Sequence, residues 1–286
     1  MKQKTWALPF GPKPVLDFDA SASRIEVQAI EPGAQPRIEA KSTPLEVTQA
    51  GDVLRVRIAG WKGAPDFGPG MVSTLLSARY GGEFRLYLPQ GVKARIAANM
   101  SEVRIRGLAG CDLEVATNAG QLMVEDSRGR FNLRAKAGQI VGKRLGGTFK
   151  VESGAGEALL DVVQLDPGAH TVHSTMGSVK LELTPGLDVR IESRTVMGST
   201  RTKYPSNPTA DTVIKVEAEL GAVKVREGAA YDDPRHGDWP DWRKAWLSDP
   251  TGVAVSESPS ELRTILELVR QKKLSPEEAD RLIDSL

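Results

Sequence analysis

A glycine that returns at nearly constant spacing is the feature that most constrains this chain. Seven segments place an apolar residue before glycine (serine once), each followed by a strand-like run, at spacings of 19, 18, 18, 21, 21 and 23 residues. They are Met100-Ser101, Ala119-Gly120, Ala137-Gly138, Ala155-Gly156, Met176-Gly177, Met197-Gly198 and Leu220-Gly221. A second series falls between them: Gly110, Gly129, Gly147, Gly168 and Gly186. Each repeat therefore holds two strands with a bend before each, because glycine tolerates tight backbone turns.

Between the glycines, residues alternate with period two. After Gly129, the side chains of Phe131 and Leu133 share one face, and those of Arg130 and Arg134 share the other. Equivalent residues recur at one offset from the glycine, so they are predicted to stack in columns. The first column is Leu113, Phe131, Phe149, His170 and Ile191; the second is Val115, Leu133, Val151 and Val172, broken by Ser193; the third, of small residues, is Thr117, Ala135, Ser153, Ser174 and Thr195.

This pattern predicts a mainly β fold, a β-solenoid or β-prism-like stack of repeats of about 18–23 residues, because each coil buries its face only against its neighbours. The predicted β-repeat domain is 1–228, and an antiparallel meander sandwich is the alternative. Its first part, 14–60, fits the repeat more loosely. An insertion at 61–82 interrupts the repeat, either as a plug for one end of the stack or as a surface insertion. Strands are expected at Arg24–Gln28, Pro36–Ala40, Leu45–Thr48 and Val53–Ile58.

The C-terminal part has a different composition. Residues 229–256 are predicted to be a Trp- and Pro-rich linker containing Trp239, Trp242 and Trp246. Residues 257–286 are predicted to form a small α-helical hairpin, since Ser-Pro-x-Glu capping boxes begin at 258 and 275. Each helix is too short to be stable alone, so we expect the hairpin to dock on the β domain, another copy or a partner. Its apolar positions are Leu262, Ile265, Leu266, Val269, Ala279, Leu282, Ile283 and Leu286.

Charge and composition exclude several functions. The 38 basic and 37 acidic residues leave a net charge of +1, and aromatic residues make up 5%. A nucleic-acid partner is not expected, because such proteins carry excess positive charge and stacking aromatics. The apolar run at the N-terminus stops at Pro9, and no stretch is long enough to cross a membrane. We expect a protein made in the cytoplasm; peripheral contact with a membrane and export by another route stay open.

No catalytic, cofactor-binding or metal-binding residue is expected. His170 and His173 fall on opposite faces of one strand and so cannot hold one metal ion together. Cys111 has no histidine nearby in the sequence, and we interpret it as a structural thiol. Three acidic pairs are interpreted as solvated outer residues beside opposite charges, namely Asp112 with Glu114, Glu125 with Asp126, and Glu157 with Asp161.

One outward position departs from the polar pattern. The third residue after the corner glycine should point outward, and in successive repeats it is Arg104, Met123, Val141, Leu159, Lys180, Arg201 and Lys224. We call Met123, Val141 and Leu159 the outer strip. Apolar strips of this kind are usually covered or bind a partner. We expect the Trp segment or the hairpin, of this chain or of another copy, to cover it. The alternative is a slipped register that turns these residues inward.

The glycine-marked repeats of 100–228 resemble the DUF4097-type putative adhesin, or toast-rack, β-strand repeat family. The segment 265–283 resembles the SHOCT-like helical hairpins that accompany such domains, although there the hairpin is often at the other end. The resemblance implies bacterial cell-envelope stress systems, surface or membrane association and self-assembly. It brings no active site.

Two functions follow. The first is a non-catalytic scaffold that assembles with itself or docks another protein through the outer strip and the hairpin. The second is a carbohydrate- or envelope-polymer-binding module derived from a β-solenoid enzyme, which would need exposed aromatics or a carboxylate groove along the stack.

Overall fold

The described part of the chain is built from strands. The computed structural model describes residues 3–11, 13–20, 23–31, 33–41, 45–58 and 82–228. Seventeen strands there belong to one mixed hydrogen-bonded sheet, and no helix occurs among the described residues, so the prediction of a mainly β fold is confirmed. The linker 229–256, the hairpin 257–286 and the insertion 61–82, except Gly82, lie outside the described residues.

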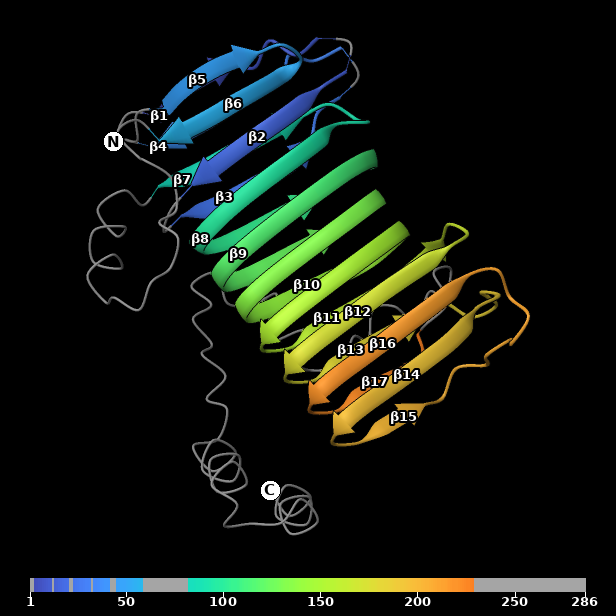
Figure 1. Ribbon diagram of the computed structural model, residues 1–286. Coiled ribbons are helices and arrows are strands. Elements are labelled where there is room, and N and C mark those ends of the chain that lie inside the picture. The colour runs from blue at the N-terminus through green and yellow to red at the C-terminus, as the bar shows by residue number, and fades with distance from the viewer. Residues whose placement is uncertain are drawn as a thin grey trace, which may run out of the picture. The chain divides into compact units, whose positions relative to one another are not determined.

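The strands stack as rungs in two walls (Figure 1). Three long strands turn at a corner and contribute to both walls: β8 (Lys93–Arg106), β9 (Ala109–Glu125) and β10 (Arg128–Ala155). The first wall also holds β5 (Leu45–Ala50), β6 (Val53–Ile58), β2 (Val15–Ala20), β12 (Ala169–Met176), β16 (Val213–Leu220) and β14 (Arg190–Met197). The second also holds β1 (Gln3–Ala7), β4 (Arg37–Lys41), β7 (Glu83–Leu88), β3 (Arg24–Ala29), β11 (Ala158–Leu165), β13 (Val179–Leu183), β17 (Val223–Glu227) and β15 (Thr200–Thr202).

The predicted columns form inside the stack. Leu133 lies opposite Val115, and Val151 lies opposite Val172, in parallel registers. All four side chains are buried, together with Phe131 of the neighbouring column. All pairings in the repeat region are parallel, so the antiparallel sandwich is wrong there. Antiparallel pairs occur at the N-terminal end, where β1 pairs with β4, β4 with β7, and β5 with β6.

The order of the rungs differs from the order of the chain at both ends of the stack. β16 lies between β12 and β14, so Ile214, and not Ile191, is the neighbour of His170. Likewise, β2 lies between β6 and β8. The expected column through His170 to Ile191 is therefore corrected, since a further rung separates them. All repeats share one offset from the glycine, which fixes the face of a residue but not the order of the rungs.

The corner glycines form a ladder that only glycine can occupy. Gly138 has a φ of 126°, and a Cβ built there would lie 1.8 Å from the carbonyl oxygen of Gly120. A similar clash recurs from Gly156 to Gly138 and from Gly177 to Gly156. The backbone of each rung therefore rests directly on the one before it, which accounts for the glycine period in the sequence.

The column of small residues contains two buried hydroxyls without partners. Ser153 and Ser174 lie opposite each other, both are buried, and within the described structure neither Oγ has a hydrogen-bond partner. Ala218, the next residue beside Ser174, shows that a methyl group fits this column. Burying a hydroxyl without a hydrogen bond is unfavourable.

We therefore expect Ser174→Ala to raise the free energy of unfolding by about 1 kcal/mol, because the buried hydroxyl is removed and the methyl group remains. Chemical denaturation followed by circular dichroism measures this. Thr117→Val is the matched control, since the Thr117 hydroxyl in the same column donates to the carbonyl oxygen of Asn99 at 3.1 Å and its loss should destabilise the fold. Destabilisation by Ser174→Ala would contradict the assignment of an unpaired hydroxyl.

The last rung closes with polar side chains. Ser193 Oγ lies 3.0 Å from Thr202 Oγ1, where deeper rungs carry buried apolar residues such as Val216. The Tyr204 hydroxyl donates to the carbonyl oxygen of Thr184 and accepts from the N–H of Leu187, both at 2.8 Å. A polar last rung is the feature that terminal capping repeats use to stay soluble.

Candidate interaction surface

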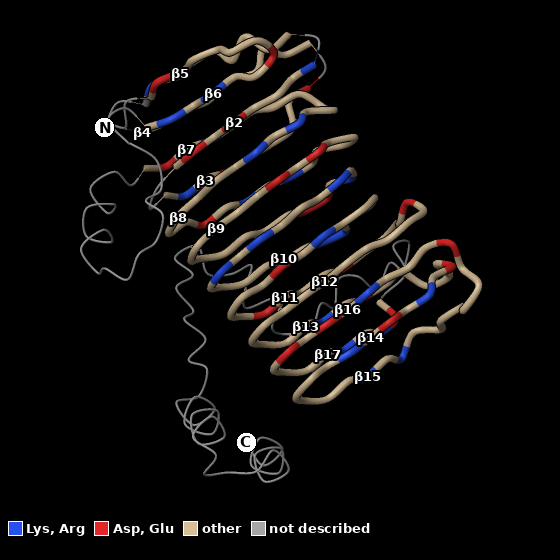
Figure 2. Tube along the Cα trace, viewed as in Figure 1, with Lys and Arg blue, Asp and Glu red and all other residues tan. Residues whose placement is uncertain are grey.

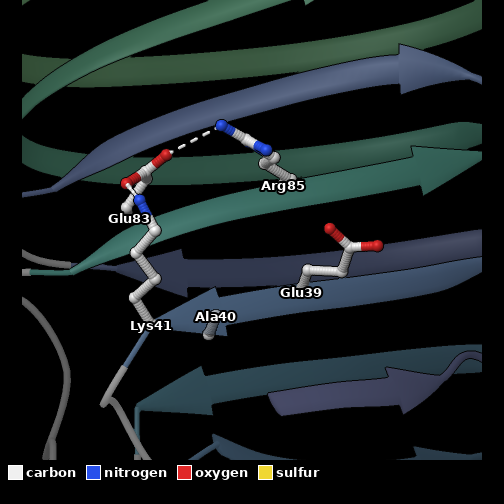
Figure 3. A pocket seen from close by; sticks show the side chains of 5 residues that line it. All are labelled: Glu39, Ala40, Lys41, Glu83 and Arg85. Atoms are coloured by element: carbon white, nitrogen blue, oxygen red, sulfur yellow. Dashed lines mark hydrogen bonds and ion pairs between the residues drawn. The ribbon is translucent and has the colours of Figure 1, made fainter. Parts of the chain in front are cut away.

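A shallow hollow over β4 and β7 is occupied by matched charges (Figure 3). Glu83 forms ion pairs with Lys41 and, at 3.1 Å, with Arg85. The hydrogen bond from Lys41 lowers the pKa of Glu83, so this carboxylate is ionised at neutral pH. Glu39, also at the hollow, pairs with Arg37 at 3.0 Å. Each carboxylate at the hollow therefore lies beside at least one basic side chain.

The two strand histidines lie on opposite faces, as their spacing predicts. His170 is fully buried beside Phe149, with ring centroids 4.9 Å apart, and its Nε2 lies 2.9 Å from the carbonyl oxygen of Asp166. Desolvation lowers the pKa of His170, so the ring is neutral at pH 7. His173 points outward, 3.5 Å from Glu219. Within the described residues, no group of three or more His, Cys, Asp or Glu side chains is placed to hold a metal ion.

Cys111 is a buried thiol at a corner of the stack. Its Sγ donates to the carbonyl oxygen of Arg128 at 3.5 Å, and burial raises its pKa to about 12. A thiol that stays protonated at neutral pH is a poor nucleophile.

The outer carboxylates lie beside basic side chains, as the sequence indicates, and Figure 2 shows both signs interspersed along the stack. Asp126 pairs with Arg144, and Glu157 lies 3.4 Å from Lys180. Glu125 departs from the expectation of a solvated residue, because its side chain is only 9% exposed. Arg106 and Lys143 approach it at 2.5 and 2.9 Å, a cluster that compensates a largely buried charge.

The outer strip lies in one continuous row of neighbouring strands. Val141 of β10 lies opposite Met123 of β9 on one side and opposite Leu159 of β11 on the other. Basic residues follow at both ends of the row, with Arg104 opposite Met123 and Lys180 opposite Leu159. The row ends with Lys224 and then Arg201, because the last two rungs are exchanged relative to the sequence.

The side chains of the strip point away from the core, and two of the three are nevertheless buried. Leu122 and Val124 belong to the core cluster, whereas Met123 between them does not. Met123 is 1% exposed and Val141 5% exposed, and Leu159 is half-buried. Because the flanking residues occupy the core side, the slipped register is wrong, and the burial of Met123 and Val141 has another origin.

A ladder of polar side chains runs beside the strip. The Nε2 of Gln121 donates to Gln139 at 2.9 Å, and the Nε2 of Gln139 donates to Glu157 at 3.3 Å. Ser178 Oγ continues the ladder, donating to Glu157 at 2.8 Å. Our sequence interpretation did not include this ladder. Its signal was present, since these residues all follow the corner glycine directly.

Exposed apolar residues mark the corner on the other side of this ladder. Met100 and Met176, both in the position before the corner residue, are 46% exposed, and Val196 at the last rung is 66% exposed. Between these methionines, the same corner position is alanine in the middle rungs, at Ala119, Ala137 and Ala155. The large apolar side chains of this corner therefore do not form a continuous row.

The remaining predicted interaction residues lie outside the described residues. They are Trp239, Trp242, Trp246, Leu262, Ile265, Leu266, Val269, Leu282 and Ile283. Across the described ranges, no helix has the length and apolar character needed to cross a membrane.

The fold and its surfaces define the class as a mainly β repeat protein with stacked strands. No family model matches the chain, and no curated protein matches it. Similar solved structures include a putative cell adhesion protein from Clostridium sporogenes (11% identity, TM-score 0.36, covering 79% of this chain and 99% of that one). Putative adhesins from Bacteroides fragilis (12%, TM-score 0.30, 79% and 97%) and Parabacteroides merdae (16%, TM-score 0.32, 78% and 95%) are also similar.

Proposed function

We propose that this chain is a non-catalytic scaffold of the β-solenoid or toast-rack type that binds proteins through one outer face. The observation that carries the proposal is the continuous outward row of Met123, Val141 and Leu159 across three hydrogen-bonded strands. An apolar row on an otherwise charged face is typical of an interaction surface. The many parallel backbone contacts between rungs suit a rigid support for such a surface.

The finer assignments are also proposals. By resemblance, the chain belongs with DUF4097-type putative adhesins that carry a SHOCT-like hairpin, and acts in bacterial cell-envelope stress. Partners are then another copy of the chain or a second protein, engaged through the strip and the helical hairpin 257–286. We propose a cytoplasmic location, with peripheral contact to the membrane or an envelope polymer.

Polymer binding is the weaker alternative. The ladder from Gln121 to Ser178 resembles a polar track suited to sugar hydroxyls, but its members already bond one another. Glu157, its one carboxylate, also lies beside Lys180. A sugar would have to displace these bonds, whereas the neighbouring apolar strip needs only a complementary apolar partner.

The test of the scaffold proposal is Leu159→Glu in the full chain. A carboxylate in the apolar strip should lower the mass measured by light scattering or reduce the free energy of unfolding by about 1–2 kcal/mol, because a charge loses hydration at a covered face. Lys224→Glu, two rungs along the same row and between Lys180 and Arg201, is the control and should leave the mass and the stability unchanged. If Leu159→Glu changes neither quantity, the strip is not an interaction surface.

A further inference from the structure

The row that carries the outer strip becomes basic at the last three rungs. Beyond Leu159 it continues through Lys180 of β13, Lys224 of β17 and Arg201 of β15, each directly opposite the next. We call these three residues the basic row. Neighbouring strands lie about 4.8 Å apart, and like charges directly opposite each other destabilise a sheet. Lys180 has one acidic neighbour, Glu157 at 3.4 Å.

At its other end the same row alternates in sign. Arg85 lies directly opposite both Glu39 and Glu26, so each charge there faces the opposite charge. The basic row lacks this compensation. Lys224 and Arg201 are exposed, and neither forms an ion pair with a residue that the structure describes. These rungs therefore hold positive charge that the described fold itself does not use.

An apolar corner accompanies the basic row on the same three rungs. Met176 of β12, Leu220 of β16 and Met197 of β14 are neighbours at the position before the corner glycine, and we call them the corner ridge. Met176 is 46% exposed, and the other two are partly exposed. Each precedes the basic residue of its rung by four positions. In the middle rungs the order is reversed, because alanine occupies the corner and the row itself is apolar.

Exposed apolar side chains beside uncompensated positive charges suit an anionic membrane surface. Peripheral proteins bury apolar groups at the headgroup boundary and attract anionic lipids, and each Lys or Arg near the surface strengthens binding about fivefold. A soluble polyanion would engage the charges and leave the ridge unused. On the first-wall side of this corner, Glu217 and Glu219 have side chains 54% and 52% exposed. A negative surface is therefore attracted to the second-wall side and repelled by the first.

We propose, resting on the peripheral membrane contact of the proposed function, that the last three rungs bind an anionic phospholipid surface. The basic row meets the lipid phosphates, and the corner ridge lies at the headgroup boundary. The outer strip takes no part in this contact. Protein binding through the strip and lipid binding through the last rungs are separate properties of one rigid stack.

Vesicle sedimentation of the full chain tests this proposal. The chain should sediment with vesicles of equimolar phosphatidylcholine and phosphatidylglycerol, and not with vesicles of phosphatidylcholine alone. Replacing Lys180, Lys224 and Arg201 together by glutamine should weaken this partitioning about a hundredfold, since each charge contributes about fivefold. Met176→Ser should weaken it at least about threefold, because less apolar surface is buried at the membrane.

The matched control removes the same charge from the other wall. Arg57, Arg95 and Arg130 are exposed on the outer face of the first wall, far along the stack from the last rungs. Replacing these three together by glutamine leaves the same net charge as the first triple variant. This control should partition nearly as well as the parent, because the charges that it lacks do not face the lipid.

Each other result overturns the proposal. Failure to sediment with the anionic vesicles would exclude a membrane contact. Equal weakening by the two triple variants would assign the binding to overall charge, and release by inorganic phosphate would assign it to a site for free anions. Unchanged partitioning of Met176→Ser would exclude the corner ridge.

Lys224→Gln alone, with a loss of about fivefold, is the second variant if the triple replacement fails to fold by circular dichroism. The scaffold function fails separately, when Leu159→Glu changes neither mass nor stability.

Discussion

Gly138→Ala is expected to destabilise the β domain by more than about 3 kcal/mol, enough to prevent folding of many domains. A Cβ at this position would lie 1.8 Å from the carbonyl oxygen of Gly120, and backbone held by the neighbouring rungs cannot move away cheaply. The φ of 126° adds conformational strain for any L side chain. Chemical denaturation monitored by circular dichroism measures the effect.

Gly168→Ala is the matched control for this prediction. Its φ of 123° is nearly the same, but a Cβ there meets nothing within 4 Å. The control therefore carries the conformational strain without the steric clash and should cost about 1–3 kcal/mol. The difference between the two variants isolates the contact between rungs. Equal losses of stability would show that the glycine period reflects backbone conformation alone.

The glycine period and the alternation predicted the stacked core because both are local properties of the chain. Gly138 fixes a bend. Along the strands that flank it, alternate side chains point to the core and to the surface. Leu133 and Val151 are therefore placed correctly from the sequence alone, and so is the outward row through Val141. These features depend on the offset from a glycine and not on which rung lies beside which.

The order of the rungs could not be predicted, because the offset from a glycine does not say which rung lies beside which. Ile191 and Ile214 both satisfy the offset of the His170 column, and the choice between them depends on where the loop after β15 carries the chain. At the N-terminal end, the expected strands are present, yet the antiparallel pairing of β5 with β6 follows from a turn that the repeat does not contain.

Burial on the outer face could not be predicted from the repeat either. The alternation of side chains along the strand places Glu125 and Met123 on the outer face, where side chains are normally hydrated. Their burial depends on contacts with side chains elsewhere in the chain, which the repeat pattern does not contain. The strip was therefore identified by its apolar row, whereas the ionic cluster of Glu125 with Arg106 and Lys143 emerged only from the structure.

The second large effect is a loss of stability on acidification that arises from His170. The ring is fully buried, and desolvation lowers its pKa in the folded state, opposed by the hydrogen bond to the Asp166 carbonyl and by the Asp166 charge. The unfolded chain binds the proton first as the pH falls below about 6.5. The contribution of His170 is therefore complete above that pH and is lost as the pH falls towards the folded-state pKa, by at most about 1.4 kcal/mol per pH unit.

His170→Phe should remove this dependence while keeping the column intact. Phe131 and Phe149 precede it at the same offset, so a third phenylalanine suits the site, although the bond to Asp166 is lost. The measurement is the free energy of unfolding of both proteins from pH 7.5 down to pH 4.5. The slope of this free energy against pH is then compared between them. His173→Phe is the control, because His173 is partly exposed beside Glu217 and Glu219 and lies outside the core. If His170→Phe and the parent lose stability in parallel, the carboxylates and not the buried ring govern the acid sensitivity of the fold.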